Sequence, residues 1–131
     1  MITNNNNKYI LLVDDDKDTI YTFDLYLKSL GFSTKPFVNP VEALNYFNTN
    51  FTNFILVITD YAMPQMSGID LIQKIREKDH NYRIKIILIS ATIKDDVINY
   101  DDRFLKLKVD KFLEKPIPLE EFKNEIKMLI E

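Results

Sequence analysis

Three apolar runs in this chain are each followed directly by a polar side chain: residues 9–13 by Asp14, residues 54–59 by Asp60, and residues 84–89 by Ser90. Apolar runs of this length are typical of strands buried on both faces, as in a parallel sheet covered by helices. They are too short to cross a bilayer, which takes about 20 apolar residues. The chain is therefore expected to fold around a central parallel sheet.

The segments between these runs carry apolar residues at helical spacing, which predicts amphipathic helices. The inward positions we predict for four helices are Ile20, Phe23, Leu27 and Leu30; Leu44 and Phe47; Leu71, Ile72 and Ile75; and Leu119, Phe122, Ile126 and Leu129. Gly31 stands where the first helix would end, and Asn39 caps the second, with Pro40 at its first position. Ser67 and Gly68 begin the third helix.

Two further strands complete the pattern. Residues 32–37 form one, ended by Pro36, and residues 111–114 form the other. Between them, residues 93–109 give only a weak helical pattern, with no glycine to mark where a helix ends. Strands and helices thus alternate along the chain, which predicts an α/β fold with right-handed crossovers and helices on both faces of the sheet.

Composition excludes several function classes. The 131 residues include no cysteine and one histidine, His80, so disulfides, thiolate metal sites and histidine relays are ruled out. The formal net charge is −3 and no basic block occurs, which argues against direct DNA binding. Residues 1–7 lack the basic and apolar parts of a signal peptide; we expect a disordered polar arm, a single domain over residues 8–131, and a cytoplasmic location.

Polar side chains at the carboxyl ends of the strands indicate the site, because ligands of doubly wound sheets bind at that edge. The groups placed there are Asp14, Asp15, Asp60, Ser90 and Lys115. Three crowded carboxylates repel one another unless protonated or joined by a cation, and Mg²⁺ is the hard cation that carboxylates and phosphate oxygens share. Since no histidine or cysteine is available as nucleophile, a carboxylate would accept a phosphoryl group, and Asp60 is the most central.

Each of these residues has an ordinary explanation when it is taken alone. An acidic triplet after a strand is often a solvated loop, and Asp60 would pass for a turn residue. The coincidence of polar groups at four strand ends favours a site.

Four segments carry a family resemblance. They are Ile10–Asp16, Asp60–Gly68, Ile89–Ala91 and Leu113–Pro116. Together they resemble the response-regulator receiver domain of two-component signalling, over nearly the whole chain after residue 7. The resemblance implies a doubly wound (βα)5 flavodoxin-like sandwich, with a five-stranded parallel sheet in the order 2-1-3-4-5.

The resemblance also assigns roles. Asp60 would be phosphorylated, and Asp14 and Asp15 would hold Mg²⁺ together with Asp60 and the backbone carbonyl of Ala62. Ser90 and Lys115 would contact the phosphoryl oxygens. Phe112 falls at the family's rotating aromatic position, so Ser90 and Phe112 would form the switch.

We therefore predict a stand-alone receiver that takes a phosphoryl group from the phosphohistidine of a histidine kinase or phosphotransfer protein. Its only enzymatic steps would be self-phosphorylation and autodephosphorylation. Phosphorylation would shift a surface around the fourth helix and fifth strand toward a downstream protein partner, with no membrane or DNA contact.

Two alternatives remain open. In a small haloacid-dehalogenase-like Mg²⁺-dependent phosphatase, Asp14 or Asp16 would be the nucleophile, but no pair of aspartates follows Lys115 and the chain is short for that family. A pseudo-receiver would bind partners without being phosphorylated. A Rossmann nucleotide site is excluded, because no glycine-rich loop follows the first strand.

The chain departs from the receiver pattern before the fifth strand. Lys108, Val109 and Asp110 stand where the family commonly has Gly-Ala. This difference leaves the shape of the preceding helix unpredicted.

Overall fold

The computed structural model of this protein describes residues 8–91 and 102–130. Its five parallel strands pair in the order β2-β1-β3-β4-β5, which confirms the predicted fold class. The strands are β1 (Tyr9–Val13), β2 (Ser33–Phe37), β3 (Phe54–Asp60), β4 (Lys85–Ser90) and β5 (Lys111–Glu114). The helices are α1 (Lys17–Ser29), α2 (Pro40–Asn50), the short 3₁₀ helix η1 (Phe51–Asn53), α3 (Gly68–Lys78), α5 (Arg103–Leu107) and α6 (Leu119–Ile130).

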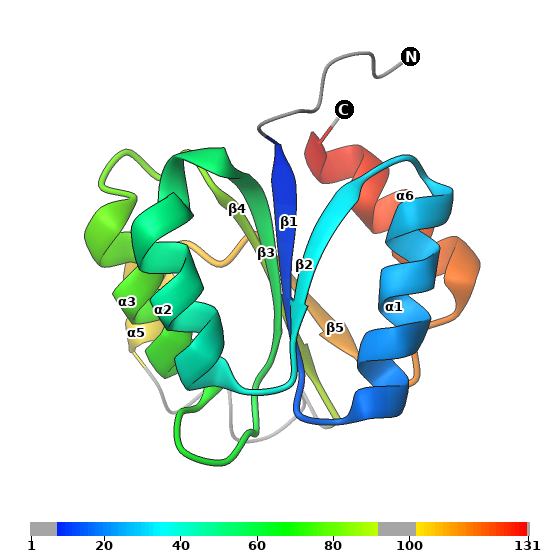
Figure 1. The fold of residues 1–131 in the computed structure, drawn as a ribbon, viewed down its shortest axis with the longest axis horizontal. Helices are drawn as coiled ribbons and strands as arrows, with labels where there is room; N and C mark the ends of the chain where they lie inside the picture. Colours follow the sequence, from blue (N-terminus) through cyan, green and yellow to red (C-terminus); the bar gives the residue numbers. More distant parts are fainter. Residues whose placement is uncertain (1–7, 92–101, 131) are drawn as a thin grey trace.

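Helices cover both faces of the sheet: α1 and α6 lie on one side, and α2, α3 and α5 on the other (Figure 1). Alternate strand residues point to opposite faces, so the core has two layers. In β1, for example, Leu11 and Val13 pack toward α2 and α3, whereas Ile10 and Leu12 pack toward α1 and α6. This two-sided burial explains why the strands appear in the sequence as continuous apolar runs.

The helix boundaries follow the predicted signals. The side chain of Asn39 accepts hydrogen bonds from the backbone N–H groups of Val41 and Glu42, and Pro40 begins α2. Gly31 follows α1 with φ +93°, a conformation that side-chain-bearing residues rarely adopt. These local signals therefore fix where the chain turns between the layers.

Two predictions need correction. Pro36 does not end β2 but lies within it, because β2 is an edge strand whose outer side needs no N–H donor. Leu119, the first residue of α6, is 37% exposed rather than inward. Leu44 is half-buried and packs against the core, in line with its predicted inward position.

The region before β5 contains the short helix α5, which ends at Lys108 with φ +54° in the left-handed region. A lysine thus adopts the conformation for which glycine is usual. The rest of the weak helical pattern, and the predicted arm over residues 1–7, lie outside the described residues. Among residues 8–91 and 102–130, no helix has the length and apolar character needed to cross a bilayer.

Candidate functional site

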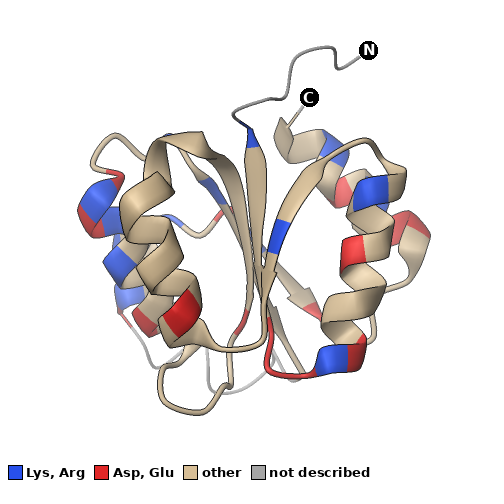
Figure 2. Ribbon diagram, viewed as in Figure 1, with Lys and Arg blue, Asp and Glu red and all other residues tan. Residues whose placement is uncertain are grey.

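Three carboxylates meet at the carboxyl-terminal edge of the sheet, as the sequence predicts. Asp14 and Asp15 follow β1 and Asp60 is the last residue of the neighbouring strand β3, and one oxygen from each lies within 4.8 Å of the others. Asp14 and Asp60 are buried, whereas Asp15 is exposed. Figure 2 shows acidic residues, in red, where the chain leaves the central strands β1 and β3.

Lys115 joins the two buried carboxylates. Its backbone N–H donates to the Ser90 carbonyl at 2.9 Å, which continues the β4–β5 ladder by one residue. From this position its Nζ lies 2.8 Å from Asp14 Oδ2 and 3.3 Å from Asp60 Oδ1. The ladder therefore delivers the ammonium group to the acidic cluster.

One ammonium does not compensate the carboxylates. Burial, and then the negative charge of Asp14, raise the pKa of Asp60 to about 6 despite the opposing effect of Lys115. Burial likewise raises the pKa of Asp14. Burial lowers the pKa of Lys115, but its contacts with Asp14 and Asp60 outweigh that effect, so the net shift is upward. The site carries excess negative charge and favours an additional cation.

The donor set fits Mg²⁺. This ion prefers carboxylate oxygens, uses one to three of them, and keeps several water molecules. Asp14, Asp15 and Asp60 supply such oxygens from two adjacent strands, and the exposure of Asp15 leaves the cluster open to solvent on one side. These three residues would hold the ion.

Gly68 allows α3 to start against the strand that carries Asp60. A Cβ atom at Gly68 would lie 2.2 Å from the Asp60 carbonyl oxygen, a distance that no real contact reaches. The Gly68 N–H donates to the Tyr61 carbonyl at 2.7 Å, and the Ser67 hydroxyl caps α3 by accepting from the Asp70 N–H. The close approach holds the end of β3, and with it Asp60, in a fixed position.

Asp16 lies outside the carboxylate cluster. It caps α1, accepting from the Asp18 N–H at 3.0 Å and from the Thr19 hydroxyl at 3.0 Å. The hydrogen bond from Thr19, followed by that from Asp18, lowers its pKa. Its role as a helix cap speaks against Asp16 as a nucleophile.

The remaining predicted residues surround the cluster. Ser90 is buried at the end of β4, and Ala62 is exposed two residues after Asp60. The half-buried Phe112 packs edge-on against Phe104 of α5, with ring centroids 5.2 Å apart. The metal contact of the Ala62 carbonyl and the movement of Phe112 stay predictions.

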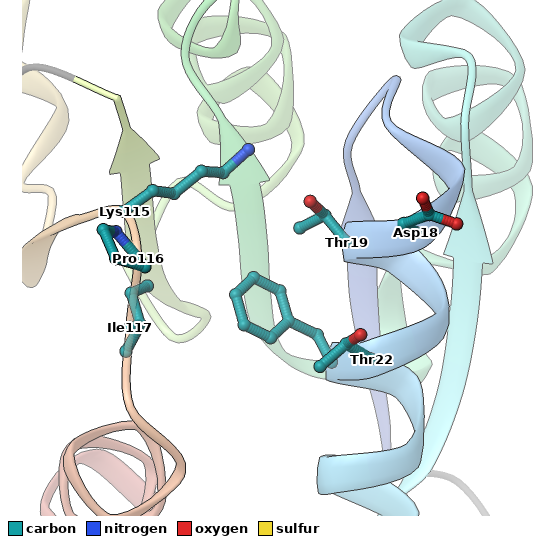
Figure 3. Close-up of a pocket in the computed structure, with 7 residues that line it drawn as sticks. Asp18, Thr19, Thr22, Lys115, Pro116 and Ile117 are labelled. Carbon is teal, nitrogen blue, oxygen red and sulfur yellow. The ribbon is translucent and has the colours of Figure 1, made fainter.

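A cavity of about 460 Å³ adjoins the carboxylate cluster at Lys115 (Figure 3). Its walls are Asp18, Thr19, Thr22 and Phe23 of α1 and Lys115, Pro116 and Ile117 after β5. Figure 3 shows Lys115, Pro116 and Ile117 facing Thr19 and Thr22 of α1. Because the cavity arises where α1 faces the segment after β5, no local sequence pattern marks it.

Comparison with known proteins identifies the family. Residues 10–127 match the model of the response regulator receiver domain, so the chain belongs to this family of two-component signalling domains. It is 31% identical over 122 residues to the 3',5'-cyclic-nucleotide phosphodiesterase regA of Dictyostelium discoideum, and 30% identical over 115 residues to the chemotaxis protein CheV1 of Helicobacter pylori. These alignments cover 93% and 86% of this chain but only 15% and 35% of the two relatives.

Solved structures show the same fold. The response regulator TrrA from Thermotoga maritima, solved in complex with Mg²⁺ and BeF, superposes with a TM-score of 0.79 at 30% identity, covering 94% of this chain and 99% of that one. CheY in the CheX–CheY–BeF₃–Mg²⁺ complex from Borrelia burgdorferi gives a TM-score of 0.81 at 25% identity, covering 94% and 89%.

Proposed function

We propose that Asp60 accepts a phosphoryl group from the phosphohistidine of a histidine kinase or phosphotransfer protein, in the presence of Mg²⁺. The observation that carries this proposal is the cluster of Asp14, Asp15 and Asp60 around the Lys115 ammonium at the carboxyl edge of the sheet. We expect this reaction to take place in the cytoplasm. We do not propose that the protein acts as an enzyme on other molecules; its reactions would be its own phosphorylation and dephosphorylation.

In the transfer, a carboxylate oxygen of Asp60 attacks phosphorus, a P–O bond forms, and the N–P bond of the donor breaks with its electron pair returning to the imidazole. A pKa of about 6 leaves most of the Asp60 carboxylate ionised at neutral pH, and ionised Asp60 is the nucleophilic form. The Lys115 ammonium is within reach of the incoming oxygens, and bound Mg²⁺ would supply further charge neutralisation. Water hydrolysing the acyl phosphate would return Asp60 to its starting state.

Phosphorylation would then act through Ser90 and Phe112. Ser90 lies beside Lys115 through the β4–β5 ladder, and the Phe112 ring packs against α5. A phosphoryl group that attracts the Ser90 hydroxyl would change the packing of Phe112 and Phe104, and so the surface around α5 and β5. A downstream protein partner would bind that surface.

The test is phosphorylation with acetyl phosphate and Mg²⁺, read by intact mass and by mapping the modified residue. Asp60→Asn abolishes the label, whereas Asp16→Asn keeps it because Asp16 caps α1. Label retained in Asp60→Asn and lost in Asp14→Asn would support the phosphatase-like alternative. A wild-type chain that takes no label under any donor would leave only the pseudo-receiver.

A further inference from the structure

The buried arginine Arg76 lies outside the phosphoacceptor site and joins three segments. Only 7% of the residue is exposed. Its Nε donates to the Leu107 carbonyl at 2.8 Å and its Nη2 to the Lys108 carbonyl at 2.9 Å. Its Nη1 donates to Asp79 Oδ2 at 2.8 Å and to the Ile84 carbonyl at 2.7 Å. One side chain of α3 thus holds the end of α5, the start of β4 and the end of α3 itself.

The segment that Arg76 holds has a conformation that its own residues do not favour. Lys108, the C-cap of α5, has φ +54°, and Tyr82, between α3 and β4, has φ +55°. Neither is a glycine, so the surrounding contacts must keep both in the left-handed region. The Tyr82 ring lies 4.9 Å from the Arg76 guanidinium carbon and 4.6 Å from Lys108 Nζ. The ring therefore contributes to holding the same turn.

Two carboxylates complete the arrangement. Asp79 also accepts from the Ile84 N–H at 2.8 Å, and Asp110 accepts from the Ile86 N–H at 2.7 Å while lying 4.0 Å from Arg76 Nη2. The first bond joins the start of β4 to the end of α3, and the second joins the residue before β5 to β4. We name Arg76, Asp79, Tyr82, Lys108 and Asp110 the basal cluster.

The basal cluster lies at the opposite end of the sheet from Asp60. β5 runs from Lys111, next to the cluster, to Glu114, next to Lys115, and Phe112 lies between these ends. On α5, Phe104 contacts Phe112 near one end, and Leu107 contacts Arg76 at the other. Arg76 therefore holds the C-terminal end of α5. Near the N-terminal end of α5, Phe104 contacts Phe112, the aromatic residue of the proposed switch.

We propose that Arg76 is a positioning residue that fixes the α5–β5 turn, so that the response to phosphorylation is confined to the Phe104–Phe112 end of α5. This inference rests on the proposed function, because it assumes that Phe112 responds to the state of Asp60. With the turn fixed, a change at Phe112 moves the beginning of α5 relative to α3. When Arg76 does not fix the turn, the same change at Phe112 spreads through the turn and into β5.

The experiment compares hydrogen exchange of backbone amides with and without beryllofluoride plus Mg²⁺, which mimic the phosphorylated state. Arg76→Lys keeps a positive charge but loses the planar fork that reaches four acceptors. The matched control is Arg83→Lys, since the Arg83 side chain also donates to two carbonyls at this end of the sheet, but to those of Phe51 and Phe54 rather than to carbonyls of the α5–β5 turn.

In the absence of beryllofluoride, Arg76→Lys raises exchange over residues 104–112 at least tenfold, while the control and residues 8–37 of either variant stay within about twofold of wild type. Beryllofluoride binds Arg76→Lys with an affinity within about threefold of wild type, yet the change it causes now extends through residues 107–112. Two results would show that Arg76 does not position the α5–β5 turn. One is amide exchange in Arg76→Lys that equals exchange in Arg83→Lys. The other is a beryllofluoride-induced change in Arg76→Lys that covers the same residues as in the wild type.

Tyr82→Leu gives a second measurement should Arg76→Lys fail to fold. Tyr82 is 40% exposed, so its loss leaves the core intact, and exchange over residues 104–112 rises about threefold. No increase there overturns the proposal. A wild-type protein that ignores beryllofluoride and takes no label defeats the proposed function instead, while the metal-free exchange still reports on Arg76.

Discussion

The two ends of the sheet use buried charge in opposite ways. At the carboxyl end, the Lys115 ammonium contacts Asp14 and Asp60 of the three clustered carboxylates, and the pKa of Asp60 still rises to about 6 because burial and Asp14 disfavour its ionised form. At the amino end, Arg76 finds a hydrogen-bond acceptor for each of its three nitrogens, and Asp79 accepts from three donors. The difference separates a binding site from a structural contact: the first leaves charge uncompensated, and the second does not.

The largest effect is expected at the amino end of the sheet, where Arg76 compensates the buried charge of Asp79. Arg76→Met leaves Asp79 as a buried charge without its partner and removes donors from three carbonyls, so the free energy of unfolding falls by about 3–5 kcal/mol. Urea unfolding followed by circular dichroism measures this loss. Arg83→Met, at an exposed arginine near the same end, is the control and loses about 1 kcal/mol or less. Equal losses in the two variants would remove the contrast between the two ends.

The next effect has the opposite sign and lies at the uncompensated end. A raised pKa means that folded Asp60 holds its proton more tightly than unfolded Asp60, so metal-free stability falls as pH rises from about 4 to about 6. At 1.36 kcal/mol per pKa unit, a shift of roughly two units costs about 3 kcal/mol at neutral pH. Asp60→Asn recovers this amount at pH 7 and removes the corresponding fall. If the pH–stability curves of the variant and the wild type run parallel, ionised Asp60 does not destabilise the folded protein.

Magnesium offers a smaller test of the same excess charge. With an assumed Kd of about 1 mM, about 10 mM Mg²⁺ stabilises the folded protein by roughly 1.4 kcal/mol, a few degrees in Tm. KCl at matched ionic strength controls for screening. Asp15→Asn should raise metal-free stability and lose most of the Mg²⁺ response. A full response in that variant would place the ion elsewhere.

The smallest effect concerns backbone conformation alone. Gly31 has φ +93° and open space where a Cβ would stand, so Gly31→Ala loses about 1 kcal/mol through its conformation and not through a clash. Gly31→Asn loses less, because asparagine tolerates positive φ. Thermal unfolding of the two variants side by side checks the order. If alanine and asparagine cost the same, the loss does not come from φ.

The carboxyl end could be predicted from sequence because one rule places it. Each apolar run that predicts a strand is followed directly by a polar residue: Asp14, Asp60 or Ser90. Parallel strands bring their carboxyl ends to one edge of the sheet, so these residues lie together. Lys115 follows the last strand in the same way. The site thus depends on strand positions, which the chain encodes locally.

The amino end could not be predicted, because nothing local marks it. Asp79 stands in a polar stretch beside the exposed His80, yet Asp79 is buried. The burial of Asp79 comes from contacts with Arg76 and with Ile84 at the start of β4. Lys108 likewise ends α5 without the glycine signal, because Arg76 holds its carbonyl from another element.

Pro36, which was expected to end β2, has a consequence for how copies of this protein meet. The edge strand of any open sheet offers unpaired N–H and C=O groups on which a second copy can add a strand and begin to aggregate. Here one outer edge carries Pro36, exposed and without an N–H, next to Lys35, and the other edge is β5, only four residues long. Both borders resist edge-to-edge polymerisation, so a concentrated solution of this chain is protected against growing into fibrils through its sheet.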